Sequence, residues 1–214
     1  MTTHYEDEAQ AERLKTWWKE NWMALAGGLA IGLAAIFGWE GWGKYQSQRA
    51  EKASRMYEDL KLAIADARRD EAASIGDALI KEHGGSPYAS DAALYLAADA
   101  VKAGTLDQAL SRLQWVREHG ADDGLRQLAR LREARVLWQQ GQIDPALALL
   151  DGVKGPEFVS LVEELRGDIR LAQGDRGAAR AAYEKALAAI GEEDPALRSG
   201  LQRKIDDLAD VVQS

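Results

Sequence analysis

The stretch GQIDPAL, residues 141–147, is the second of three similar heptapeptides in this 214-residue chain. GTLDQAL lies 37 residues before it, at 104–110, and GDRGAAR lies 33 residues after it, at 174–180. In each copy an alanine follows the first glycine by five residues, and another small residue precedes that glycine by seven. The turn glycines are Gly104, Gly141 and Gly174, the following alanines are Ala109, Ala146 and Ala179, and the preceding small residues are Ala97, Ala134 and Gly167. A unit of 33–37 residues therefore recurs along the chain.

The recurring unit predicts a pair of antiparallel helices. Small residues are needed where two helix axes cross, and glycine favours the turn at which the first helix ends. A hairpin of this length buries its faces only by stacking on neighbours, which produces a solenoid. The spacing resembles the tetratricopeptide repeat, although most aromatic positions of that motif are missing. Helix-forming residues dominate, and apolar residues recur at helical spacing in stretches such as LRQLARLREARVLW, so the fold class predicted is all-α.

The sequence predicts five segments. They are an N-terminal tail at 1–20, a transmembrane helix at 21–42, a juxtamembrane linker or helix at 43–53, tetratricopeptide-like repeats at 54–194 and a C-terminal capping helix at 195–214. The repeats are predicted at 54–85, 86–123, 124–157 and 158–194.

The transmembrane prediction rests on the uncharged residues 21–39. A helix of this length spans about 28 Å, close to the hydrocarbon thickness of a bilayer. Aromatic rings flank both ends, as the two membrane interfaces favour: Trp17, Trp18 and Trp22 on one side and Trp39, Trp42 and Tyr45 on the other. A cleaved signal peptide is disfavoured, because its leader would be short and basic and its apolar stretch shorter.

Two properties of the span stay open on sequence grounds. Basic residues are nearly balanced on its two sides, so charge does not fix its orientation. Ala24, Gly28 and Gly32 recur every four residues and share one face, where a second membrane helix could approach closely. The alternative is that glycine and alanine are simply common in membrane helices.

The composition offers little for catalysis. The chain has no cysteine, three histidines and a net charge of −8, so thiolate sites and a nucleic-acid partner are disfavoured. No phosphate-binding loop or nucleophile–base pair is recognisable. We expect no enzyme activity, no cofactor and no metal site.

A binding surface remains as the candidate functional site. By repeat register, Tyr95 and Lys102 of one hairpin face Arg132, Arg135, Trp138 and Gln139 of the next. Such a groove commonly receives peptide segments, and the arginines with Trp138 could grip a carboxylate and an apolar side chain. The alternative is that Trp138 packs between repeats and the arginines pair with nearby acids.

The whole chain resembles the YfgM family of bacterial inner-membrane proteins. The resemblance lies in an acidic leader ending in an aromatic pair, a Gly/Ala-rich span leaving through GWEGW, and LRGDIRLAQGDRGAARAAYEKAL in the last repeat. It implies a single-pass protein with a cytoplasmic N-terminus and a periplasmic repeat domain. It also implies association with the Sec translocon and the membrane-anchored chaperone PpiD, and handover of emerging, still unfolded secreted chains to periplasmic chaperones.

A second function remains open beside this one. The chain could be a membrane-anchored scaffold for another cell-envelope assembly, without contact with nascent chains. The first function predicts a groove that binds unfolded segments broadly, and the second predicts one fixed, folded partner.

Overall fold

A computed structural model describes residues 3–191 and 194–210, with side chains for 12–191 and 194–208. All regular structure in these ranges is helical, which confirms the all-α prediction. The predicted tail, repeats and cap also include residues 1–2, 192–193 and 211–214, which lie outside the described residues. The helices are α1 (Thr3–Ala65), α2 (Arg69–His83), α3 (Pro87–Lys102), α4 (Leu106–His119), α5 (Asp123–Gln139), α6 (Ile143–Asp151), the short η1 (Pro156–Phe158), α7 (Val159–Ala172), α8 (Arg176–Ala189) and α9 (Pro195–Asp210).

The chain divides into two units, residues 1–51 and 52–214. The first unit is helical from residue 3 onward and lies within α1. Its most apolar 18-residue window has a mean hydropathy of 1.7, and none of that window is buried. By length and composition, the helix is therefore long and apolar enough to cross a membrane. A Cβ added at Gly28 or Gly32 would meet no atom within 4 Å, so this face of the helix is open.

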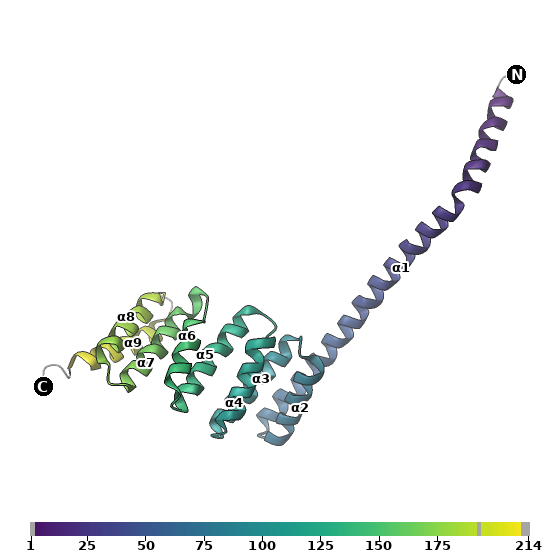
Figure 1. Ribbon diagram of the computed structural model, residues 1–214. Coiled ribbons are helices and arrows are strands. Elements are labelled where there is room, and N and C mark those ends of the chain that lie inside the picture. The colour runs from purple at the N-terminus through teal and green to yellow at the C-terminus, as the bar shows by residue number, and fades with distance from the viewer. Residues whose placement is uncertain (1–2, 192–193, 211–214) are drawn as a thin grey trace. The chain divides into compact units, whose positions relative to one another are not determined.

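The second unit is a stack of helical hairpins, arranged in chain order in Figure 1. The first hairpin joins the end of α1 to α2, and α3–α4, α5–α6 and α7–α8 follow. We call the first helix of each hairpin its A helix and the second its B helix. Each B helix from α2 to α6 also contacts the next A helix, and α9 packs on α8. This continuous packing is the solenoid that the repeat spacing predicts.

The turns within the hairpins use the predicted glycines. Gly104, Gly141 and Gly174 have φ angles of 77°, 79° and 83°, in the left-handed region that glycine adopts without a Cβ penalty. The first hairpin lacks this glycine, and Ala67 takes the equivalent place with φ 57°. Because an L side chain is disfavoured there, the first turn carries strain that the other three avoid.

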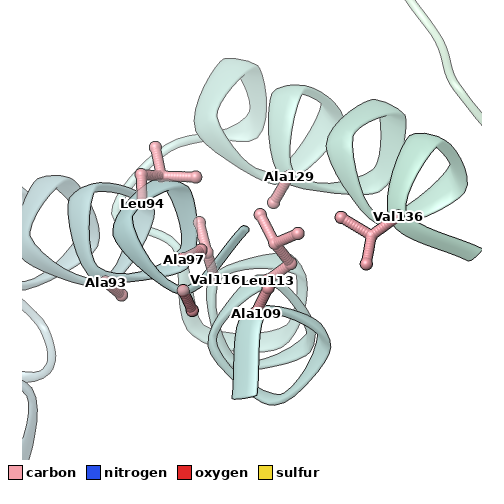
Figure 2. Close-up of a cluster of buried hydrophobic side chains, with 9 residues drawn as sticks. Ala93, Leu94, Ala97, Ala109, Leu113, Val116, Ala129 and Val136 are labelled. Atoms are coloured by element: carbon pink, nitrogen blue, oxygen red, sulfur yellow. The ribbon is translucent and has the colours of Figure 1, made fainter. Parts of the chain in front are cut away.

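The helix crossings pair a small residue with a large one. Ala97 packs in one core cluster with Leu113, as Figure 2 shows, and Ala134 packs in the next cluster with Leu150. At the equivalent crossing of α7 with α8, a Cβ on Gly167 would lie 2.4 Å from the ring of Tyr183. The larger Tyr183 ring therefore requires glycine where the other hairpins have alanine.

The last helix covers the end of the stack. Leu201, Ile205 and Leu208 of α9 are buried in a cluster with Tyr183 and other residues of α8. The apolar stripe expected for a cap is thus turned toward the preceding hairpin.

Candidate functional site

The predicted groove residues lie on two neighbouring A helices that contact each other, α3 and α5. Four of their side chains are exposed and two, Tyr95 and Trp138, are half-buried. We call the set the A-helix face, and its members are Tyr95 and Lys102 from α3 and Arg132, Arg135, Trp138 and Gln139 from α5.

Arg132 and Arg135 are exceptional among the arginines from residue 68 to 203. Within the described part of the chain, every other arginine in this range makes an ion pair or a hydrogen bond, and these two make neither. They stand one helical turn apart, so their positive charges are close. Partial burial, and then the charge of Arg135, lower the pKa of Arg132.

Three acids of α5 and of the neighbouring α7 are bound by other cations. Glu133, between them on α5, is buried and accepts a 2.8 Å hydrogen bond from Nε of Arg117 on α4. Glu164 and Asp168 on α7 are held by Nζ of Lys204 from α9, at 2.8 and 2.7 Å.

The cluster around Lys204 is a structural network. The Tyr183 hydroxyl donates a 2.8 Å hydrogen bond to Asp168. Burial lowers the pKa of Lys204, but its hydrogen bonds to Asp168 and Glu164 outweigh that effect and raise it. Burial, and then the bond to Asp168, raise the pKa of Tyr183. The network joins α7, α8 and α9.

Trp138 has a structural role as well as an exposed edge. It packs against the core cluster that contains Leu131 and Ala134, as one alternative predicted. The other half of that alternative, arginines paired with acids, is not what the structure shows. Leu171, which follows Trp138 by the repeat offset of 33 residues, is 39% exposed on α7. Apolar surface therefore lies at this register position on both A helices.

The α3 side of the face is more neutral. Burial, and then the charge of Asp99, raise the pKa of Tyr95. Asp99 itself is 3.8 Å from Nε of Arg69. Lys102, at the end of α3, is exposed.

Sequence reasoning missed an aromatic pair beside these residues. The rings of Tyr57 on α1 and Tyr88 on α3 lie 5.5 Å apart, and Nζ of Lys61 lies 5.5 Å from the centre of the Tyr57 ring. The first repeat has Ala67 in place of the turn glycine and lacks the heptapeptide, so its register was poorly defined. Recognising that Ala67 takes the place of the turn glycine would have fixed the register of the first repeat and could have found the pair.

No group of three metal-ligating side chains was found in the described residues. The A-helix face carries two guanidinium groups and a half-buried indole ring.

Comparison with known proteins places the chain in a family. The sequence profile of the tetratricopeptide repeat-like domain matches residues 15–210. An Escherichia coli (strain K12) protein named ancillary SecYEG translocon subunit is 34% identical over 96% of this chain and 98% of its own length. Proteins with the same name from Haemophilus influenzae and Neisseria gonorrhoeae are each 31% identical, covering 87% and 97% of this chain and 91% and 100% of theirs.

A solved structure supports the fold alone. The crystal structure of BtubC (BKLC) from P. vanneervenii matches with a TM-score of 0.55 and 18% identity, over 78% of this chain and 84% of that one. The similarity to the named relatives includes both the apolar helix and the repeats, because it extends over nearly the whole chain. The chain therefore belongs to the family of ancillary SecYEG translocon subunits, and its repeats form a tetratricopeptide repeat-like domain.

Proposed function

We propose that this protein is a membrane-anchored, non-enzymatic subunit that associates with the SecYEG translocon. The observation that carries the proposal is the near full-length similarity to relatives with that printed name. A helical-repeat domain with an exposed A-helix face, and no metal-ligating cluster in the described residues, supports a role in protein binding.

The anchor is residues 21–42 in the bacterial inner membrane, with the tail in the cytoplasm and the repeat domain in the periplasm. The uncharged segment and its aromatic flanks support the span. The orientation follows from the family resemblance, since the basic residues on the two sides are nearly balanced.

The anchor docks on a partner membrane helix through Ala24, Gly28 and Gly32. Both glycines have open space around them, so a second helix can approach this face. The repeat domain then stands beside the exit of the translocon, where it receives unfolded secreted chains and passes them on together with PpiD. The alternative is a scaffold for another envelope assembly with one folded partner.

Affinity purification of the intact protein in mild detergent, with mass spectrometry of its companions, tests the proposal. We expect translocon subunits and PpiD, and we expect Gly28→Leu/Gly32→Leu to weaken their recovery. Ala26→Leu/Ala30→Leu also adds two leucines four residues apart, but on the opposite side of the helix, and is the matched control. Recovery of wall or division proteins without the translocon would overturn the proposal in favour of the scaffold. Equal recovery with both double variants would leave the repeat domain as the docking element.

A further inference from the structure

We infer that Arg132 and Arg135 bind two acidic side chains of an extended segment in a partner protein. The starting observation is that these guanidiniums have no ion pair or hydrogen bond, whereas the other arginines from 68 to 203 in the described chain do. Two unpaired positive charges one turn apart repel each other, and an anionic partner turns this repulsion into attraction.

Among the described residues, no acid of the protein pairs with these arginines. Lys204 holds both Glu164 and Asp168, and Arg117 holds the buried Glu133. Each of these acids is already bound by Lys204 or Arg117, so pairing with Arg132 or Arg135 would break an existing contact. The pair therefore stays available for acids from outside the chain.

The number of charges favours two acidic side chains over one chain terminus. A C-terminal carboxylate carries one negative charge, and two guanidiniums carry two positive ones. Each guanidinium presents a planar fork that fits one carboxylate in bidentate fashion. Exposure of both side chains leaves room for a separate carboxylate at each.

The surroundings of the pair indicate apolar residues between or beside these acids. Trp138 lies one turn beyond Arg135 on α5 and is half-buried, and Leu171 is exposed at the corresponding register of α7. A segment with two acidic residues and one apolar residue at every second position matches both features, because side chains two apart in an extended chain point to the same side. The overall charge of −8 makes this local positive site the more distinctive.

The inference deepens the proposed function by naming the class of segment that the A-helix face binds. It is tested separately from translocon association, because peptide binding is measured on the purified protein alone. If the peptide does not bind but the translocon subunits still co-purify, only this inference is wrong. The reverse result would leave the acidic-segment site and remove the translocon role.

The experiment uses the full chain in detergent and a fluorescein-labelled peptide, amidated at its C-terminus, in which glutamate, glutamate and leucine occupy every second position and serine fills the positions between them. Fluorescence anisotropy measures its Kd, and the comparison peptide has glutamine in place of every glutamate. We expect the acidic peptide to bind more tightly, and its affinity to fall as salt screens the charges. We expect Arg132→Gln or Arg135→Gln to weaken it about tenfold each, since a charge-assisted bond of this kind is lost.

Matched controls separate a specific site from general charge. Arg112→Gln/Arg180→Gln removes two exposed or half-buried arginines from B helices, where both are ion-paired, and should leave Kd unchanged. Arg132→Lys/Arg135→Lys keeps the charge without the planar fork and should give an intermediate affinity. Circular dichroism verifies that each variant is folded.

Three results would overturn the inference. The acidic and glutamine peptides could bind equally, or Arg132→Gln/Arg135→Gln could bind as tightly as the unchanged chain. Sedimentation could also show self-association that the double Arg→Gln change abolishes, in which case the occupant is a second copy of this chain.

Discussion

The A helices α5 and α7 have charged side chains at equivalent positions, but within the described chain these side chains are paired on α7 and unpaired on α5. Asp168 follows Arg135 by the 33-residue offset between their hairpins. On α7, Asp168 binds both Lys204 and Tyr183, and the contacts join three helices. On α5, Arg132 and Arg135 bind nothing within the described chain, although they are exposed to solvent. Asp168 therefore holds helices of the fold together, whereas Arg132 and Arg135 make no such contact in the described chain, the difference expected if these two arginines bind a partner.

The largest expected effect concerns the packing beneath the α7 network. Gly167→Ala puts a methyl group against the Tyr183 ring, at a point where the neighbouring α5 has Ala134 opposite Leu150. We expect the free energy of unfolding to fall by about 2–3 kcal/mol, because the ring must move out of a packed core. Urea unfolding followed by circular dichroism measures this.

A second change tests the same explanation. Adding Tyr183→Leu to Gly167→Ala rebuilds the alanine–leucine pair of the other hairpins, so part of the loss should be recovered. If the two changes are simply additive in the double-mutant cycle, the volume argument fails.

The next effect concerns the polar network itself. Asp168→Ala leaves the Tyr183 hydroxyl without its acceptor and Lys204 with only Glu164. We expect a loss of about 1–2 kcal/mol in the free energy of unfolding. Asp151→Ala, which removes a largely exposed partner of Arg166, is the control and should cost less. Equal losses would mean that the α7 network is no more structural than a surface ion pair.

The network also predicts a dependence on alkaline pH. Burial and the bond to Asp168 raise the pKa of Tyr183 above 10.0, so the folded state keeps a proton that the unfolded chain releases. The resulting stability is complete below about pH 10 and is lost as pH rises further. Tyr183→Phe removes this contribution. Its stability should therefore decline less than that of the unchanged chain between about pH 9 and about pH 11, by roughly 1 kcal/mol in urea titrations. Identical declines would remove Tyr183 from the explanation.

The hairpins could be predicted from sequence because their signals are local. Turn glycines and small crossing residues recur at fixed spacing, and Gly104, Gly141 and Gly174 all adopt the expected backbone. Ala67 broke the pattern, so the Tyr57–Tyr88 pair was missed. The unpaired state of Arg132 and Arg135 was not predictable, because the partners of charged side chains can lie far apart in sequence, as Lys204 does from Glu164 and Asp168, 40 and 36 residues away. Such long-range partner choices are set by packing and leave no mark in the spacing.

A smaller effect concerns the one turn that departs from the others. Ala67→Gly should raise the free energy of unfolding by about 0.5–1 kcal/mol, since glycine adopts φ 57° without the Cβ penalty. The gain is reduced by the extra freedom that glycine has in the unfolded chain. Gly104→Ala makes the reverse change in the second hairpin and should lower the thermal midpoint. A loss of stability in Ala67→Gly would show that the first turn is not strained.

The smallest expected effect on stability is also the sharpest test of the comparison between α5 and α7. Arg132→Gln/Arg135→Gln removes no ion pair or hydrogen bond that the structure shows. It also relieves the repulsion by Arg135 that, after burial, lowers the pKa of Arg132. The free energy of unfolding should stay within about 0.5 kcal/mol of the unchanged chain, or rise slightly. Residues kept for binding commonly cost the fold a little, whereas residues that hold the fold do not. A loss of stability comparable to that of Asp168→Ala would show that the arginines stabilise the fold, as Asp168 does. The proposed difference between α5 and α7 would then be wrong.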